Sequence, residues 1–282
     1  MIDLHAHLLP GVDDGPSTWQ EALEMLRIAQ EDGVKTLVAT SHQEGLDGYH
    51  NTDAELTRST EELQRRAQES GMAVTLLPGG EVRASPDLVA RLERKEALTL
   101  ADGGRYLLLE FPASEVPLYT NQLLFELQVH GITPIIAHPE RNAGFAERPE
   151  ALVSLVEAGA LVQLTAASLS SRVSVETRTL AVLFLTHNLA HVLASDAHSA
   201  TRRPPVLARY VSRVAAIVGE ERALSLVKGT PERIVRGEPV VAPPTVPISG
   251  KSRGQALKLA RALSRKKMEA SRRLRWFRFG RR

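Results

Sequence analysis

Hydrophobic and polar positions follow two different periods along residues 1–237. Short apolar or β-branched runs, among them MIDLHAH, VKTLVATSH, YLLLEF and TPIIAHPE, have the length and composition of buried strands. Each run is followed by a polar turn and, in nearly every case, by a stretch with the period of an amphipathic helix. The first such stretch follows Ser17 and Thr18, either of which can cap a helix, and ends near Gly33. Seven strand–helix units predict a parallel α/β barrel, with an open doubly wound sheet as the alternative.

The end of the chain differs from this body in composition and charge. Residues 238–254, EPVVAPPTVPISGKSRG, carry four prolines and two glycines. The chain has 35 Lys and Arg and 33 Asp and Glu. Residues 250–282 contain 13 of the basic residues and one of the acidic ones, so their net charge is +12 and that of residues 1–249 is −10. We therefore predict a barrel over 1–237, a linker over 238–254 and a basic tail over 255–282.

The basic tail has an apolar stripe at helical spacing, formed by Ala260, Leu263, Ala270, Leu274 and Phe277. A basic amphipathic segment of this kind is typical of a helix that lies on an anionic membrane surface. Binding to nucleic acid, docking on the acidic barrel and a solvated tail are the alternatives. The net negative charge of the barrel disfavours nucleic acid, because it would repel a phosphate backbone.

The composition excludes several classes of protein. There is no cysteine, which rules out a disulfide framework, a thiolate zinc site and a phosphocysteine mechanism. No apolar run approaches the roughly 20 residues that span a bilayer, and no signal peptide precedes the first strand. We therefore expect a cytoplasmic protein, with the basic tail as a candidate peripheral contact to the inner membrane.

Two histidines at the end of the first predicted strand are the first indication of chemistry. Side chains alternate along a strand, so His5 and His7 are expected on one face, with Leu4 and Ala6 on the other. Two imidazoles beside carboxylates at a strand end favour a metal site over a structural role.

The other strand ends carry the same kinds of group. In chain order they are Thr40-Ser41-His42, Gly80-Glu81, Leu109-Glu110, Ala137-His138 followed by Arg141, and Ser195-Asp196-Ala197-His198. In a parallel barrel these ends form one rim, where the active site lies. Imidazole and carboxylate ligands without thiolate suit Mn²⁺, Zn²⁺ or Fe²⁺, and the ligands are too many for one tetrahedral ion.

These motifs together resemble a known superfamily. His5-Ala6-His7, Gly80-Glu81, Glu110, the run from Ala137 to Arg141 and the run from Ser195 to His198 are similar to the motifs of the polymerase and histidinol phosphatase (PHP) superfamily of trinuclear metal phosphoesterases. Three further segments resemble the bacterial capsule and exopolysaccharide protein-tyrosine phosphatases within it: Val12-Asp13-Asp14-Gly15-Pro16, Thr40-Ser41-His42 and Arg203-Pro204-Pro205. The resemblance covers residues 1 to about 240.

The resemblance implies a distorted (β/α)7 TIM-like barrel that binds three divalent ions, with Mn²⁺ the first expectation and Fe or Zn the alternatives. The first ion would take His5, His7, Glu110 and Asp196. The second would take Glu81, Glu110 and His138, so that Glu110 bridges the pair. The third would take Asp14, His42 and His198, while Asp13 shapes the turn.

The implied activity is hydrolysis of phosphotyrosine on a membrane-associated bacterial tyrosine kinase that controls polysaccharide export. Two ions bridged by a carboxylate can activate water, and Arg141 and Arg203 would hold the phosphoryl oxygens as bidentate forks. Two other classes stay open. One is another PHP phosphoesterase, either a histidinol-phosphate-type phosphatase or a nuclease, and the other is a non-catalytic metal-binding or docking module.

Overall fold

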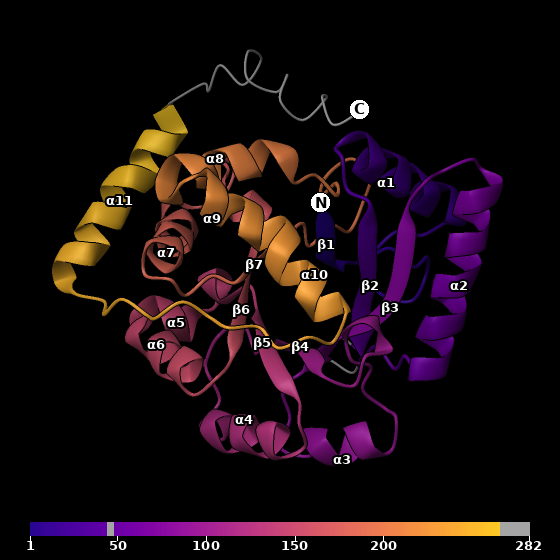
Figure 1. Ribbon diagram of the computed structural model, residues 1–282, viewed down its shortest axis with the longest axis horizontal. Coiled ribbons are helices and arrows are strands. Elements are labelled where there is room, and N and C mark those ends of the chain that lie inside the picture. Colours follow the sequence, from indigo (N-terminus) through magenta and orange to yellow (C-terminus); the bar gives the residue numbers. More distant parts are fainter. Residues whose placement is uncertain (44–47, 266–282) are drawn as a thin grey trace.

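The computed structural model describes residues 1–43 and 48–265 and contains one sheet of seven parallel strands, paired in chain order (Figure 1). The strands are β1 (Ile2–Ala6), β2 (Thr36–Gln43), β3 (Thr75–Arg83), β4 (Tyr106–Glu110), β5 (Thr133–Ala137), β6 (Leu161–Thr165) and β7 (Val192–Ala194). A doubly wound sheet would reverse its strand order part-way, and this sheet does not. The predicted parallel barrel is therefore confirmed.

The barrel closes between its first strand and the residues after its last one. Ala6 and Ala197 form a parallel bridge, the amide of Asp196 donates to the carbonyl of His5 at 2.8 Å, and the amide of His7 donates to the carbonyl of Ala197 at 2.8 Å. This contact lies at the carboxyl ends of the strands. Closure of the barrel and placement of the two histidines therefore depend on the same few residues.

Helices of very unequal length surround the barrel, which gives the distorted outline of Figure 1. Thr18 caps the first helix by accepting the amide hydrogen of Glu21, as predicted, and Thr52 forms a capping box with Glu55. The helices are α1 (Trp19–Glu31), α2 (Asp53–Glu69), α3 (Leu88–Glu93), η1 (Leu100–Asp102), α4 (Thr120–Val129), η2 (Pro139–Arg141), α5 (Ala143–Glu147), α6 (Glu150–Glu157), η3 (Ala166–Leu169), α7 (Val175–Thr186), α8 (Ala208–Val218), α9 (Glu220–Leu224), the π-helical η4 (Ser225–Gly229), α10 (Thr230–Val235) and α11 (Gly250–Arg265).

The apolar side chains form two cores. The larger lies between the strands and the helices, and the smaller unites Leu4, Val38, Leu108 and Ile135 with Ile234 of α10. A cluster that joins strands from opposite sides of a closed sheet lies inside it.

One prediction about the first strand is wrong. Leu4 was expected on the same face as Ala6, but Leu4 belongs to the inner core and Ala6 to the outer one. The reason is a bulge, because the register of β1 against β2 shifts between Asp3 and Ala6. Because of the extra residue, two consecutive side chains, those of Leu4 and His5, both lie on the inner side of the sheet.

The C-terminal segment lies against the barrel. Residues 238–249 run along its surface, where Tyr106 donates its hydroxyl hydrogen to the carbonyl of Glu238 at 2.6 Å and Val246 donates its amide hydrogen to the carbonyl of His187 at 3.0 Å (Figure 1). Residues 250–254 of the predicted linker are already helical and open α11.

Helix α11 packs on α7, with Ala256 and Ala260 buried. Arg178 of α7 donates a hydrogen bond to the carbonyl of Ala260 at 2.9 Å. The first part of the predicted membrane-facing stripe is therefore covered by protein. Its other members, Ala270, Leu274 and Phe277, lie outside the described residues. Within the described part of the chain, no helix combines the length and the hydropathy that spanning a bilayer requires.

Candidate metal centre

The two histidines of the first strand converge on one point at the carboxyl rim. The Nε2 atoms of His5 and His7 lie 3.2 Å apart, and each is 3.2 Å from Oε2 of Glu81. All three side chains are buried, so no solvent separates them. Two imidazole nitrogens and a carboxylate oxygen this close together form the geometry that a divalent ion would bind.

Glu81, at the end of β3, lies at the centre of the cluster. Its Oε1 is 2.9 Å from Nε2 of His138, and its Oε2 is 3.3 Å from Nδ1 of His42. Burial, which leaves the side chain 1% exposed, would raise the pKa of this carboxyl, but His5, His138 and His7 outweigh burial and hold the pKa well below its usual range. The carboxyl is thus ionised, as metal binding requires.

Asp196 connects the histidines to the predicted phosphate-binding arginines. Its Oδ1 is 3.5 Å from Nε2 of His5, and its Oδ2 accepts from Arg141 at 2.5 Å and from Arg203 at 2.8 Å. Burial would raise the pKa of Asp196, but Arg141 and the neighbouring histidines lower it far below its ordinary value. Both arginines stay partly exposed at the mouth.

A second group of potential ligands surrounds the exposed carboxylate of Asp14. One ligand atom from each of His7, Asp14, His42 and His198 lies within 4.8 Å of the others. Nε2 of His198 is 3.2 Å from Oδ1 of Asp14, and this hydrogen bond lowers the pKa of the aspartate. The side chain of Asp14 is 51% exposed, which leaves this part of the centre open to solvent.

Glu110 lies at the edge of the cluster, beside Arg83. Its Oε2 lies 3.3 Å from a guanidinium nitrogen of Arg83 and 3.9 Å from Nδ1 of His42, and its side chain is 21% exposed. It groups with His42 and Glu81, whereas the group around His5 and His7 contains Glu81. The allocation of ligands to individual ions stays a prediction.

Two of the rim residues have strained backbones. His138 has φ 32° and Asp196 has φ 52°, in the left-handed region that non-glycine residues seldom adopt. His138 directly follows β5 and Asp196 lies two residues after the end of β7. Their side chains contact Glu81 and His5 respectively. Strain of this kind persists where the surrounding structure requires it, typically at functional sites.

Three residues that contact the cluster were not predicted as part of it. Asp13, predicted only to shape a turn, lies 2.8 Å from Nδ1 of His7. Gln163 of β6 lies 3.0 Å from Nδ1 of His5, and Arg83 pairs with Glu110. A polar residue within the apolar run ALVQLTA was the available signal for Gln163.

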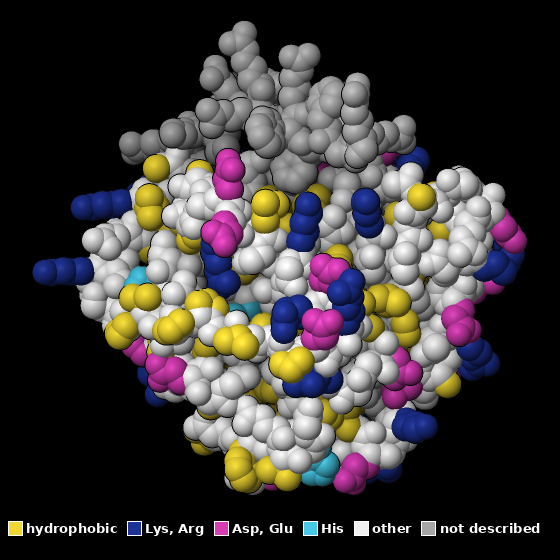
Figure 2. All heavy atoms as spheres, in the orientation of Figure 1, with side chains coloured by type: hydrophobic (Ala, Val, Ile, Leu, Met, Phe, Trp, Pro, Cys, Tyr) yellow, Lys and Arg dark blue, Asp and Glu magenta, His cyan; other side chains and the backbone are white. Residues whose placement is uncertain are grey.

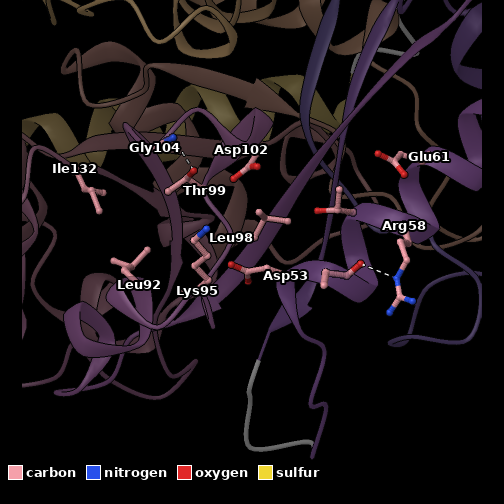
Figure 3. A pocket seen from close by; sticks show the side chains of 13 residues that line it. Asp53, Arg58, Glu61, Leu92, Lys95, Leu98, Thr99, Asp102, Gly104 and Ile132 are labelled. Carbon is pink, nitrogen blue, oxygen red and sulfur yellow. Dashed lines mark hydrogen bonds between the residues drawn. The ribbon is translucent and has the colours of Figure 1, made fainter.

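A hollow that contains none of the candidate ligands lies away from the rim. It measures about 600 Å³ and is bordered by α2 and by the segment from Leu92 to Gly104 (Figure 3). Arg58 and Lys95 alternate there with Asp53, Glu61 and Asp102, and no histidine lines it. A much smaller pocket of about 130 Å³ adjoins Glu110, His138 and Arg141 at the rim. The chemistry-bearing residues therefore converge at the rim and not at the larger hollow.

Comparison with known proteins decides the family. The model of the family described as "Capsular polysaccharide synthesis, CpsB/CapC" matches residues 1–236. The chain belongs to this family. The motif resemblance to bacterial capsule phosphatases is thereby confirmed.

Relatives in the CpsB/CapC family are similar over most of their length. The putative tyrosine-protein phosphatase CapC of Staphylococcus aureus is 41% identical over 73% of this chain and 80% of its own. The tyrosine-protein phosphatase YwqE of Bacillus subtilis is 37% identical over 72% of this chain and 79% of its own.

The same family has solved structures. One, from work on YwqE of Bacillus subtilis and CpsB of Streptococcus pneumoniae, described as unique metal-dependent tyrosine phosphatases, superposes with a TM-score of 0.83 and 32% identity. It covers 88% of this chain and all of its own.

Proposed function

We propose that this CpsB/CapC family member is a metal-dependent tyrosine-protein phosphatase that acts in capsule or exopolysaccharide synthesis. The observation that carries the proposal is the convergence of His5, His7 and Glu81 beside two arginines, Arg141 and Arg203, that share one carboxylate oxygen. Metal ligands and phosphate-binding groups thus face the same mouth. The activity printed for the relatives agrees with this chemistry.

The donor set fits a centre of several divalent ions, with Mn²⁺ as the first candidate and Fe or Zn as alternatives. Among the described residues, the candidate ligands that converge at the rim offer imidazole nitrogens and carboxylate oxygens, and several of them are buried with opposite charges as neighbours. We retain the allocation of three ions to His5, His7, Asp14, His42, Glu81, Glu110, His138, Asp196 and His198 as part of the proposal. Such ions lower the pKa of water and neutralise charge on a phosphoryl group.

Arg141 and Arg203 bind and orient the phosphoryl group in this proposal. Both guanidinium groups already reach the mouth, held there by Oδ2 of Asp196. A guanidinium presents several N–H donors in a fixed fork, so it can keep one bond to Asp196 while others bind phosphoryl oxygens. Asp196 therefore acts as the group that positions both forks.

The leaving group explains why no strong general acid is needed. A tyrosyl oxygen has a pKa near 10, far below that of an alkyl alcohol, so it departs with modest stabilisation. The exposed carboxylate of Asp14 and the neighbouring His42 and His198 mark the open side of the centre, where a tyrosine side chain of a protein can approach.

The proposed substrate is a phosphotyrosine protein, in the first place a membrane-associated bacterial tyrosine kinase. The enzyme would act in the cytoplasm, and the basic residues 266–282 would hold it near an anionic inner membrane surface. Nucleic acid is the less favoured partner, since residues 1–249 carry a net charge of −10 and would repel a phosphate backbone. On the face shown in Figure 2, acidic and basic side chains of the described residues are interspersed.

A comparison of substrates tests the proposal. The full chain, reconstituted with Mn²⁺, is assayed on a phosphotyrosine peptide, on histidinol phosphate and on single-stranded DNA. We expect the phosphotyrosine peptide to have the highest kcat/KM. Preference for histidinol phosphate or DNA would replace the proposal by another phosphoesterase activity, and no turnover of any substrate by metal-loaded protein would favour a non-catalytic module.

A further inference from the structure

Two rim histidines have a hydrogen-bond acceptor at Nδ1, the ring nitrogen other than the one that faces Oε2 of Glu81. Nδ1 of His5 lies 3.0 Å from Oε1 of Gln163, and Nδ1 of His7 lies 2.8 Å from Oδ2 of Asp13. An amide oxygen and an ionised carboxylate accept hydrogen bonds but cannot donate them. The ring nitrogen that faces such an atom therefore carries the proton.

The orientation of the Gln163 side chain follows from a second contact. Its Oε1 also accepts the backbone N–H of His138 at 3.2 Å. If the amide oxygen and nitrogen of Gln163 were exchanged, its NH₂ group would face the N–H of His138, and both groups are donors. The oxygen is therefore the atom that faces His5. Its Nε2 is buried and has no hydrogen-bond partner among the described residues. The side chain is thus placed for the contacts of its oxygen, which is the pattern expected of a functional position.

Asp13 is held just as firmly. Its Oδ1 accepts the amide hydrogen of Gly15 at 2.9 Å, and its Oδ2 accepts that of His42 at 3.1 Å as well as facing His7. The turn closes this tightly only with glycine, because a Cβ at position 15 would lie 2.8 Å from Oδ1 of Asp13. Two backbone donors and one glycine thus fix the carboxylate at Nδ1 of His7.

We propose that Gln163 and Asp13 are positioning residues that keep a proton on Nδ1 of His5 and of His7, so that Nε2 of each ring is the nitrogen that binds an ion. The inference rests on the proposed metal centre. Both Nε2 atoms already face Oε2 of Glu81 at 3.2 Å, which is the side where the ion would lie. The amide of Gln163 is neutral and the carboxylate of Asp13 is charged. The carboxylate makes the ring of His7 a more basic ligand than the ring of His5.

Metal affinity tests the inference in the full-length protein. Mn²⁺ binding is measured by calorimetry for Gln163→Met and Asp13→Leu, which keep side-chain size approximately but remove the acceptor. We expect each substitution to weaken binding about 10- to 100-fold, the range typical of groups that orient a metal-binding histidine. Gln163→Glu restores an acceptor at the same place and is expected to stay within a few-fold of wild type.

Matched control variants come from the same chain. Gln43 is another buried strand glutamine, whose amide bonds to Asp53 and to the backbone of Leu98, and Asp32 accepts the amide hydrogens of Leu207 and Ala208. Neither touches a histidine by these bonds, so Gln43→Met and Asp32→Leu are expected to leave Mn²⁺ affinity unchanged. Equal losses in test and control variants would overturn the inference.

A second measurement needs no substitution. In the Zn²⁺-loaded wild-type protein, which is diamagnetic, ¹⁵N NMR of the histidine rings is expected to show a hydrogen on Nδ1 of both His5 and His7. Nε2–H signals from either ring would contradict the inference even if every variant failed to fold. If wild-type protein bound no divalent ion at all, the proposed function itself would fail, and this inference with it.

Discussion

The barrel rim and the contact between α7 and α11 bury their residues in opposite ways. At the rim, buried charges face opposite charges, as Asp196 does between Arg141 and Arg203. Between α7 and α11 the buried side chains are chiefly apolar, among them Ala256 and Ala260, and the buried Arg178 donates to backbone carbonyls such as that of Ala260.

The difference has a consequence for mutation. Removing one partner of a buried charge pair leaves the other uncompensated, whereas trimming an apolar contact costs free energy in proportion to the area lost. The rim is therefore expected to lose function sharply and the helix contact to lose stability gradually.

The largest effect is expected at the centre of the rim. Glu81→Gln removes the charge that faces four histidines, so metal should be lost and phosphotyrosine hydrolysis should fall by more than about 10³-fold, equivalent to about 4 kcal/mol of transition-state stabilisation. Metal content by mass spectrometry and steady-state kinetics measure the two losses. Full retention of metal would show that Glu81 is not a ligand.

A companion variant tests the predicted bridge. Glu110 lies at the edge of the cluster beside Arg83 in this structure, yet it is the proposed shared ligand of two ions. If it bridges, Glu110→Ala loses metal as well as activity. A variant with the wild-type metal count and rate would refute that assignment while leaving Glu81 in place.

An arginine at the mouth should affect rate without affecting metal. Arg141→Ala removes a phosphoryl-binding fork and is expected to lower kcat/KM by about 10²–10³, or roughly 3–4 kcal/mol, at unchanged metal content. The exposed Arg148, seven residues further on, supplies the control Arg148→Ala. Loss of metal in Arg141→Ala would move this residue from substrate binding to support of the centre.

Two truncations test the helix contact. Deleting residues 250–282 uncovers the α7 surface and leaves Arg178 without its bond to Ala260, so the unfolding midpoint should fall by about 2–4 °C for each kcal/mol of stability lost. Deleting residues 266–282 alone should leave the midpoint unchanged. Turnover of a short phosphotyrosine peptide should stay within a few-fold of wild type in both.

The same truncations test the membrane proposal. Full-length protein is expected to bind vesicles of anionic lipid at low salt and to release them as salt rises, because screening shortens the reach of each charge to about 8 Å at physiological ionic strength. Both truncated forms should fail to bind. Full-length protein that ignores these vesicles but holds DNA tightly would make nucleic acid the favoured partner.

The smallest effect concerns a buried histidine away from the rim. Burial, with Arg222 nearby, lowers the pKa of His191 to about 3, and its Nδ1 accepts the amide hydrogen of Val162 at 3.1 Å. The unfolded chain, with a histidine pKa near 6.5, therefore binds a proton between about pH 6.5 and pH 3 that the folded chain does not. Stability from this group is complete above about pH 6.5 and declines as pH falls.

A substitution isolates that contribution. As pH falls from about 6 to 4, the free energy of unfolding should decrease less steeply in His191→Gln than in wild type. The two slopes should differ by up to about 1.4 kcal/mol per pH unit. Asp3, whose pKa burial raises to about 6, acts in the opposite direction but is present in both proteins. Identical slopes in chemical denaturation at each pH would exclude His191 as the source.

Sequence alone predicted the barrel and the groups at its rim because both follow from local rules. Strand ends in a parallel barrel share one edge, so His42, Glu81 and His138 could be assigned to one site without coordinates. The position of Leu4 could not be predicted, since a bulge depends on register against a neighbouring strand.

The remaining gaps have a similar cause. Gln163 supports His5 across 158 positions of sequence, and a single polar residue in an apolar strand does not reveal its partner. Helix α11 was identified as amphipathic, but its apolar side fits a membrane and a helix such as α7 equally well. The local sequence pattern specifies which side of a segment is buried, whereas the tertiary structure decides which surface covers that side.

The central claim is that the rim is a metal centre that hydrolyses phosphotyrosine, and a metal titration tests it most directly. Protein stripped by a chelator is assayed on a phosphotyrosine peptide as Mn²⁺ is added back, with metal content measured at each point. The account predicts no turnover in the stripped protein, recovery in step with bound metal, and no effect of thiol reagents on a chain without cysteine. Full turnover after verified removal of metal would contradict it.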